Sequence, residues 1–174
     1  DAEYSVKAKS VINAAGVFVD DIILMDVPST HRMVKPSQGI HLVFDKSFLN
    51  TDYAIMIPKT SDGRVLFAVP WHDKVVVGTT DIVREHAETE PKPLEEEIDF
   101  IMSTASLYMA KKPTRSDILS VFAGQRPLAA PKKEGKSTKE ISRSHKIFVS
   151  DNNLITITGG KWTTYRKMAE DTVD

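Results

Sequence analysis

The stretch LITITGGKWTTYRKMAED, residues 154–171, contains residue types that suit the binding of an anion or a polar ring. Strand-forming residues run up to Thr158, Gly159 and Gly160 break the strand, and a helix-forming composition follows Lys161. The N–H groups and partial positive charge at a helix start attract anions, and Lys161 adds a full charge there. We therefore predict a turn that closely approaches a ligand. A strand–turn–helix joint with a solvated lysine is the alternative.

Two further residues carry groups that bind or move charge. Arg126, in GQRPL, offers a planar guanidinium that pairs with two oxygens of a phosphate or carboxylate, and Pro127 favours an extended backbone before it. His41 offers an imidazole that titrates near neutral pH and can accept a proton. A surface ion pair for Arg126 and a structural role for His41 are the alternatives. The remaining histidines show no metal-like spacing with carboxylates, so we expect no metal site: His31, His72, His86 and His145.

Composition limits the classes of function. The chain has 174 residues, of which 41% are hydrophobic and 27% charged, which is typical of a globular domain. A formal net charge of -1 implies no bulk attraction to nucleic acid or anionic lipid. Cysteine is absent, which excludes disulfides and thiolate catalysis and fits a reducing compartment. We see no signal peptide and no apolar run of the roughly 20 residues that a membrane-spanning helix needs.

Runs of β-forming residues bounded by turn residues predict that much of the first half of the chain is β-sheet. We expect a buried strand at 10–15 that ends at Gly16, and then a short helical or irregular link at 20–25. Residues 40–80 predict an antiparallel meander, with PSQG at 36–39 as a turn before it and Asp62-Gly63 as a hairpin turn within it. Its strands are expected at 41–44, 53–58, 65–69 and 75–80.

Residues 94–109 have apolar side chains at helical spacing, and the glutamates at 95–97 indicate a solvated helix start. A strand is expected at 118–123, and the polar stretch 132–140 indicates a mobile surface loop. Strands at 147–149 and 154–158 should form a hairpin before the final helix.

Six segments, taken in order, resemble the FAD-dependent glycerol-3-phosphate dehydrogenases, which belong to the wider group of D-amino-acid-oxidase-like flavoproteins. GTTD, G-x-RPL and TGGK-x-TTYR-x-MAED in one order are the specific signals. The resemblance spans nearly the whole chain: VINAAG (11–16), KPSQGIHLV (35–43), VPWHDKVVVGTTD (69–81), GQRPLAAP (124–131), ISRSHKIFVS (141–150) and ITITGGKWTTYRKMAED (155–171).

The resemblance implies an α+β fold, in which an antiparallel-sheet substrate-binding domain with a helical cover joins partial segments of an FAD-binding Rossmann-type domain. The implied division is 1–30 and 132–174 for the FAD-binding segments and 31–131 for the substrate-binding domain. The family's G-x-G-x-x-G is absent, so we interpret the chain as an internal piece of a longer protein that does not hold FAD firmly by itself. Lys35 and Gln38 depart from the arginine and lysine frequent in relatives, which weakens any phosphate role for KPSQG.

The implied reaction is oxidation of sn-glycerol 3-phosphate to dihydroxyacetone phosphate by hydride transfer to FAD. By resemblance, His41 and Arg126 are catalytic, and Arg126, Lys161 and Thr80 bind substrate. The implied cofactor-binding residues are Gly16, Gly159, Gly160, Lys161, Trp162 and Thr163.

The resemblance also implies a quinone as electron acceptor, and it is compatible with a homodimer and with peripheral membrane association. We expect a cytoplasmic location at the inner face of the cell membrane and no nucleic-acid partner. Two alternatives stay open: an FAD-dependent oxidase or dehydrogenase of another amine or hydroxy acid, and a non-catalytic binding module.

Overall fold

The computed structural model describes residues 2–28, 31–58, 60, 61, 63–129 and 144–174. They form two compact units, which are described separately. Unit 1 consists of Asp1–Ser37, Arg84–Ala87 and Arg126–Asp174, and unit 2 consists of Gln38–Val83 and Glu88–Gln125. The loop expected at 132–140 lies outside the described residues. The predicted domain division stays a prediction.

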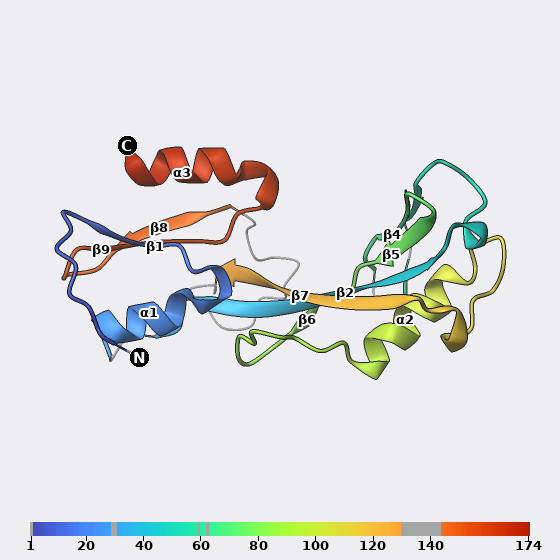
Figure 1. Ribbon diagram of the computed structural model, residues 1–174, viewed down its shortest axis with the longest axis horizontal. Helices are drawn as coiled ribbons and strands as arrows, with labels where there is room; N and C mark the ends of the chain where they lie inside the picture. The colour runs from blue at the N-terminus through green and yellow to red at the C-terminus, as the bar shows by residue number, and fades with distance from the viewer. Residues whose placement is uncertain (1, 29–30, 59, 62, 130–143) are drawn as a thin grey trace. The chain divides into compact units, whose positions relative to one another are not determined.

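Unit 1 contains a three-stranded sheet in the order β1-β9-β8. β1 (Val11–Asn13) runs parallel to β9 (Leu154–Thr158), and β8 (Lys146–Val149) runs antiparallel to β9. The helices α1 (Val19–Asp26) and α3 (Tyr165–Val173) lie on opposite faces of this sheet (Figure 1). The 3-10 turns η1 (Gly16–Phe18) and η5 (Trp162–Thr164) lead into them. The β8–β9 hairpin and the final helix are confirmed. The first strand is confirmed as β1, but its predicted burial is wrong, because Val11 and Ile12 are 57% and 47% exposed and only Asn13 is buried.

Two buried polar side chains fasten the segments of unit 1 together. Asn13 is 4% exposed, and its amide donates to the Val19 carbonyl at 2.9 Å and to Thr156 Oγ1 at 3.3 Å. Asp20 is also 4% exposed and accepts hydrogen bonds from the backbone N–H groups of Met33 and Val34, at 2.8 and 3.1 Å. These bonds compensate the loss of water, so both side chains can connect segments that are distant in sequence.

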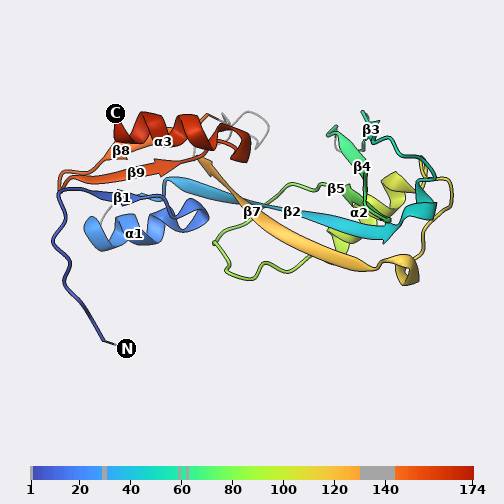
Figure 2. The same ribbon diagram turned by 45° about the horizontal axis from the view of Figure 1, so that its top comes forward.

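Unit 2 contains most of a sheet in the order β3-β4-β5-β2-β6, with β7 also paired to β2. Residues 34–37 of β2 and 126–129 of β7 are counted in unit 1. The pairs β3–β4, β4–β5 and β5–β2 are antiparallel, which confirms the predicted meander. Figure 2 shows α2 (Glu95–Ala105) beside these strands. The 3-10 turns are η2 (Lys46–Phe48) and η3 (Arg115–Asp117). The strands are β2 (Val34–Asp45), β3 (Ile55–Ile57), β4 (Leu66–Trp71), β5 (Lys74–Gly78), β6 (Ile82–Val83) and β7 (Ser120–Ala129).

Alternate residues of these strands form the core of unit 2. On β2, Ile40, Leu42 and Phe44 are fully buried, and they pack with Ile98 and Ile101 of α2. The residues between them point to the opposite face of the sheet, because side chains alternate along a strand. That opposite face, here called the outer face, carries Met56, Phe67 and Val69, which are all exposed.

The turn predicted at 36–39 is wrong. PSQG lies inside the continuous strand β2, where Ser37 and Gln38 are fully buried. Pro36 lacks an N–H group, but its carbonyl accepts a hydrogen bond from the Arg84 N–H at 2.9 Å. Pairing with distant strands therefore overrides the local preference of proline, serine and glycine for a turn.

The helix predicted at 94–109 is confirmed as α2, but its glutamates are not all solvated. Glu95 and Glu96 are exposed, whereas Glu97 is only 1% exposed. Glu97 accepts a hydrogen bond from the Leu94 N–H at 3.0 Å and so closes the first turn of the helix. No helix in the described part of the chain is long and apolar enough to cross a bilayer.

Candidate active site

The turn between β9 and α3 is the part of unit 1 with the most predicted site residues. Gly159 and Gly160 have φ angles of 77° and 75°, a backbone conformation that residues with a Cβ rarely adopt. A Cβ on Gly159 would lie 2.8 Å from the Ser144 carbonyl oxygen, and one on Gly160 would lie 2.4 Å from Met168 Sδ. Both glycines are thus required by conformation and by the close packing of the chain itself around the turn.

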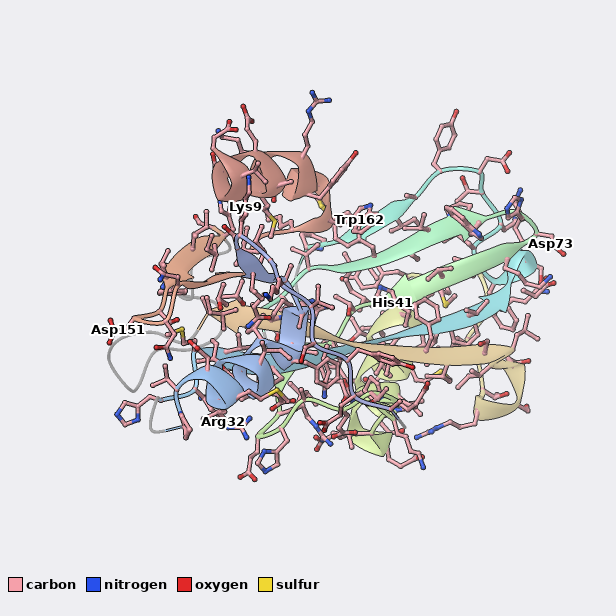
Figure 3. The ribbon with its side chains drawn as sticks, turned by 60° about the vertical axis from the view of Figure 1, so that its left-hand side comes forward. Lys9, Arg32, His41, Asp73, Asp151 and Trp162 are labelled. Carbon is pink, nitrogen blue, oxygen red and sulfur yellow. The ribbon has the colours of Figure 1, made fainter. Side chains whose placement is uncertain are left out.

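Lys161 follows the glycines as the N-cap of η5, and its backbone is fixed by Thr164. The Lys161 N–H donates to Thr164 Oγ1 at 3.2 Å, and that hydroxyl donates to the Lys161 carbonyl at 3.0 Å. The Lys161 side chain is exposed, as are Trp162 and Thr163. Figure 3 shows Trp162 beside the start of α3, where its ring stacks on Tyr165 with 5.7 Å between ring centroids. A cation and an aromatic surface are therefore presented together at this helix start.

A hydrogen bond between His145 and Asp171 connects α3 to the residue before β8, and Asp171 also pairs with Lys167 of the same helix. His145 Nε2 lies 2.8 Å from an Asp171 oxygen, and Lys167 Nζ lies 2.7 Å from the other. The hydrogen bond from Lys167, together with that from His145, lowers the pKa of Asp171, although partial burial opposes this. These contacts help to hold α3, and with it the Lys161 turn, in place.

The two other predicted residues of unit 1 are Gly16 and Arg126. Gly16 follows β1 with a φ angle of 61°, and a Cβ there would meet nothing within 4 Å, so its backbone faces open space. Arg126 lies in β7 and is partly buried, and the extended backbone predicted before Pro127 is confirmed. A separate cavity of about 200 Å³ in unit 1, between α1 and the β8–β9 hairpin, has none of the predicted residues in its lining.

In unit 2, His41 lies on the outer face of the sheet, between two fully buried core residues of β2, Ile40 and Leu42. Its ring stacks on Phe122 of β7, with 5.1 Å between centroids and 13° between ring planes. His41 is therefore partly exposed and held by an aromatic neighbour, which suits a side chain that must reach a ligand.

Thr80 is 3% exposed, and its hydroxyl is used within the protein. Thr80 Oγ1 donates to a Glu97 oxygen at 2.5 Å and accepts from the Ile40 N–H at 2.9 Å. The Gln38 amide donates to the other Glu97 oxygen at 2.7 Å and to the Lys92 carbonyl at 2.8 Å. A substrate contact by Thr80 stays a prediction, and these bonds favour a supporting role. The sequence offered no signal for Glu97 beyond its place at the third position of the helix.

The model of the DAO family, described as FAD dependent oxidoreductases, matches residues 1–166. The chain belongs to this family. The match confirms the flavoprotein group inferred from the motifs. Among the described residues, no three histidine, cysteine, aspartate or glutamate side chains group as a metal site.

Several similar relatives in this family are named glycerol-3-phosphate dehydrogenases, which confirms the resemblance seen in the motifs. The mitochondrial enzyme of Arabidopsis thaliana is 46% identical over 99% of this chain and 27% of its own length. That of Mus musculus is 42% identical over 99% of this chain and 24% of its own length. The chain thus spans about a quarter of the length of these relatives.

Solved structures give the same result. A glycerol-3-phosphate dehydrogenase from Bacillus halodurans, complexed with FAD, superposes with a TM-score of 0.83 and is 39% identical over 98% of this chain and 32% of that one. A glycine oxidase from Bacillus cereus has a TM-score of 0.55 at 18% identity, over 96% of this chain and 41% of that one, and shares the fold. The mixed α/β architecture is therefore that of FAD-dependent family members.

The residues of unit 1 fit the flavin that this family uses. Thr158 is 2% exposed, and its hydroxyl has no hydrogen-bond partner among the described residues. It lies just before the glycine pair, next to the exposed cation and helix start at Lys161. An unpaired hydroxyl, a cation and the open backbone at Gly16 are suitable partners for the polar edge and phosphates of a dinucleotide.

Proposed function

We propose that the chain forms part of a flavin-dependent dehydrogenase that oxidises sn-glycerol 3-phosphate to dihydroxyacetone phosphate. The observation that carries the proposal is the 46% identity over 99% of the chain to an enzyme of that name. The FAD-complexed structure with a TM-score of 0.83 supports it. Because the chain spans about a quarter of such relatives, it supplies only some of the residues that act in catalysis.

The two units fit different tasks. In unit 1, the parallel strands β1 and β9 are each followed by a glycine, a 3-10 turn and a helix, as in a Rossmann-type sheet. We assign unit 1 to the FAD-binding domain. Unit 2 has an antiparallel sheet with α2 on one face, and we assign it to the substrate-binding domain.

The substrate carries a phosphate and a secondary alcohol, and the protein must hold the first while the second reacts. Arg126 can bind two phosphate oxygens through its planar guanidinium, and β7 fixes the backbone that bears it. Lys161 adds a second cation at a helix start, with its backbone held by Thr164. We assign Arg126 and Lys161 to the substrate anion.

Oxidation removes a hydride from C2 and a proton from the C2 hydroxyl, which leaves a carbonyl. His41 is the group we assign to accept the proton, because imidazole is a common general base and the His41 ring is partly exposed. FAD, when bound, supplies the acceptor for the hydride. Arg126 would also polarise the hydroxyl oxygen as negative charge develops on it.

For the flavin itself we propose backbone contacts at Gly16, Gly159 and Gly160, and side-chain or backbone contacts at Lys161, Trp162 and Thr163. The open space beside Gly16 and the exposed first turn after the glycine pair support this assignment. Thr164 is excluded from the set because its hydroxyl already caps the backbone of Lys161.

Electron transfer to a membrane quinone, homodimer formation and a location at the inner face of the cell membrane are proposals that rest on the resemblance alone. Several relatives are named as mitochondrial. Cell fractionation with and without high salt, followed by detection of the protein in the membrane pellet, tests the location.

Dye reduction by the flavin-loaded full-length protein tests the reaction. Glycerol 3-phosphate is compared with glycerol, lactate and glycine, which lack the phosphate and represent the other alcohol, hydroxy-acid and amine substrates. We expect turnover with glycerol 3-phosphate only. Preference for lactate or glycine would instead identify an oxidase or dehydrogenase of another hydroxy acid or amine.

Arg126→Ala tests the assignment of residues. It should lower kcat/KM by about 100-fold or more, the usual effect of removing a group that binds developing charge. Arg115→Ala is the matched control, since Arg115 is an exposed arginine that pairs with Glu95 and Asp99 on α2. Equal activity of the two variants contradicts the role of Arg126.

A further inference from the structure

The neighbours of His41 across the sheet identify residues that control its ring. In the antiparallel pair of β2 and β5, His41 lies directly opposite Gly78, and Gly78 lies opposite Phe67 of β4. Residues opposite each other point to the same face of a sheet. Phe67, Gly78 and His41 therefore lie side by side on three neighbouring strands, on the outer face of the sheet. Gly78, in the middle, has no side chain.

The His41 ring occupies the space that a side chain at Gly78 would take. A Cβ built on Gly78 would lie 2.3 Å from His41 Cδ2, 2.8 Å from Cγ and 2.9 Å from Nε2. These distances are shorter than any normal contact, and the ring is rigid, so it would have to rotate away. The φ angle of Gly78 is not positive, unlike that of Gly159 or Gly160. Glycine is therefore required at position 78 by the lack of room for a side chain, and not by the φ angle.

A second contact restricts the face of the ring. Phe122 of β7 stacks on His41 with only 13° between the ring planes, at a centroid distance of 5.1 Å. An aromatic pair of this kind contributes about 0.5–1.5 kcal/mol beyond burial of area. One edge of the imidazole thus lies against the Gly78 backbone and one face lies against Phe122, so both contacts restrict the orientation of the ring.

We propose that Gly78 and Phe122 are positioning residues that hold the His41 imidazole in the orientation needed for proton transfer. The catalytic part of this inference rests on the proposed function, in which His41 accepts the substrate proton. Small displacements of a catalytic group can cost about 100-fold in rate, so a methyl group at position 78 should be sufficient to impair the reaction.

The first experiment measures the ring itself and does not depend on activity. The histidine ring signals of the chain are recorded by NMR for the wild type, Gly78→Ala and Phe122→Leu. His41 is assigned from a His41→Asn variant. Gly124→Ala is the matched control, because a Cβ on Gly124, in the same unit, meets nothing within 4 Å. We expect the His41 signals to shift in Gly78→Ala and Phe122→Leu but not in Gly124→Ala.

The second experiment measures the reaction in the flavin-loaded full-length protein. Gly78→Ala should lower kcat by about 10- to 100-fold with a smaller change in KM, and it should shift the acidic limb of the pH–rate profile. Phe122→Leu should produce a weaker effect of the same kind. Thermal melting verifies that each variant is folded, and Phe122→Leu decides the question if Gly78→Ala does not fold.

Unchanged His41 signals in both variants would overturn the positioning role of Gly78 and Phe122. If His41→Asn nevertheless abolishes turnover, the proposed function stands without that role. Shifted signals with unchanged kcat would also overturn it. Absence of any turnover of glycerol 3-phosphate by the wild type would instead refute the proposed function. The NMR comparison does not depend on turnover, so it would still show whether Gly78 and Phe122 hold the His41 ring.

Discussion

Replacing Glu97 tests whether the buried network beneath Thr80 stabilises unit 2. Glu97 is 1% exposed and accepts three hydrogen bonds, from Thr80 Oγ1, Gln38 Nε2 and the Leu94 N–H. Glu97→Ala removes the hydrogen bonds from the Thr80 hydroxyl and the Leu94 N–H, and each loss costs about 1–3 kcal/mol. Gln38 retains the Lys92 carbonyl. We expect the free energy of unfolding to fall by about 3–5 kcal/mol once the cavity is included.

Glu97→Gln should cost less, about 1–2 kcal/mol. Its amide oxygen can replace the carboxyl oxygen that accepts from Gln38 and Leu94, and only the Thr80 hydroxyl loses its acceptor. Equilibrium unfolding in urea, with the slope compared among variants, measures these differences. Glu96→Ala is the matched control, because Glu96 is the exposed neighbour on the same helix and should change stability by less than about 0.5 kcal/mol. The reasoning is refuted if Glu97→Ala costs no more than Glu96→Ala.

Three further predictions concern the turn and helix of unit 1. Gly160→Ala should lower the free energy of unfolding by about 1–3 kcal/mol, because alanine resists the φ angle of 75° and its Cβ would meet Met168; Gly124→Ala is the reference in the same thermal melt. Because the pKa of Asp171 is lowered in the folded protein, its ionised carboxylate stabilises the fold. This stabilisation is present above the ordinary aspartate pKa of about 3.9 and is lost as pH falls through the lowered pKa. The stability difference between wild type and Asp171→Asn should therefore be present at about pH 6 and shrink below about pH 4, as followed by circular dichroism, and a difference independent of pH would contradict the assignment. The purified 174-residue chain should show no stoichiometric flavin absorbance in the visible range, since it lacks the G-x-G-x-x-G that holds the pyrophosphate, and a yellow protein with one FAD per chain would disprove this.

Local patterns were sufficient for most of the elements. Runs of β-forming residues and the turn residues between them predicted β4 and β5, and helical spacing of apolar residues predicted α2. The error at PSQG arose because the pairing partners of that segment are distant in sequence. Burial of Ser37 and Gln38 depends on those partners, and composition alone does not reveal it.

The site was predictable only in part for the same reason. Residue chemistry and motif order selected His41, Arg126 and Lys161 as candidates, because imidazole, guanidinium and ammonium groups have recognisable uses. The residues that support them have no chemical signature: Gly78 is an ordinary strand glycine until His41 is seen to lie over it. Glu97 looks like its solvated neighbours until Thr80 is seen to donate to it. Their roles depend on contacts with other elements of the fold.

The pairing of β1 with β9 has a consequence for biosynthesis. The amide of Asn13 reaches Thr156, which lies 143 residues later in the chain, so the sheet of unit 1 forms only after nearly all of these residues have left the ribosome. Unit 2 lies between the two segments and contains its own core, so it can fold while the ribosome is still making β9. During that interval β1 lacks its partner strand, and its unpaired backbone N–H and C=O groups are open to pairing with other chains.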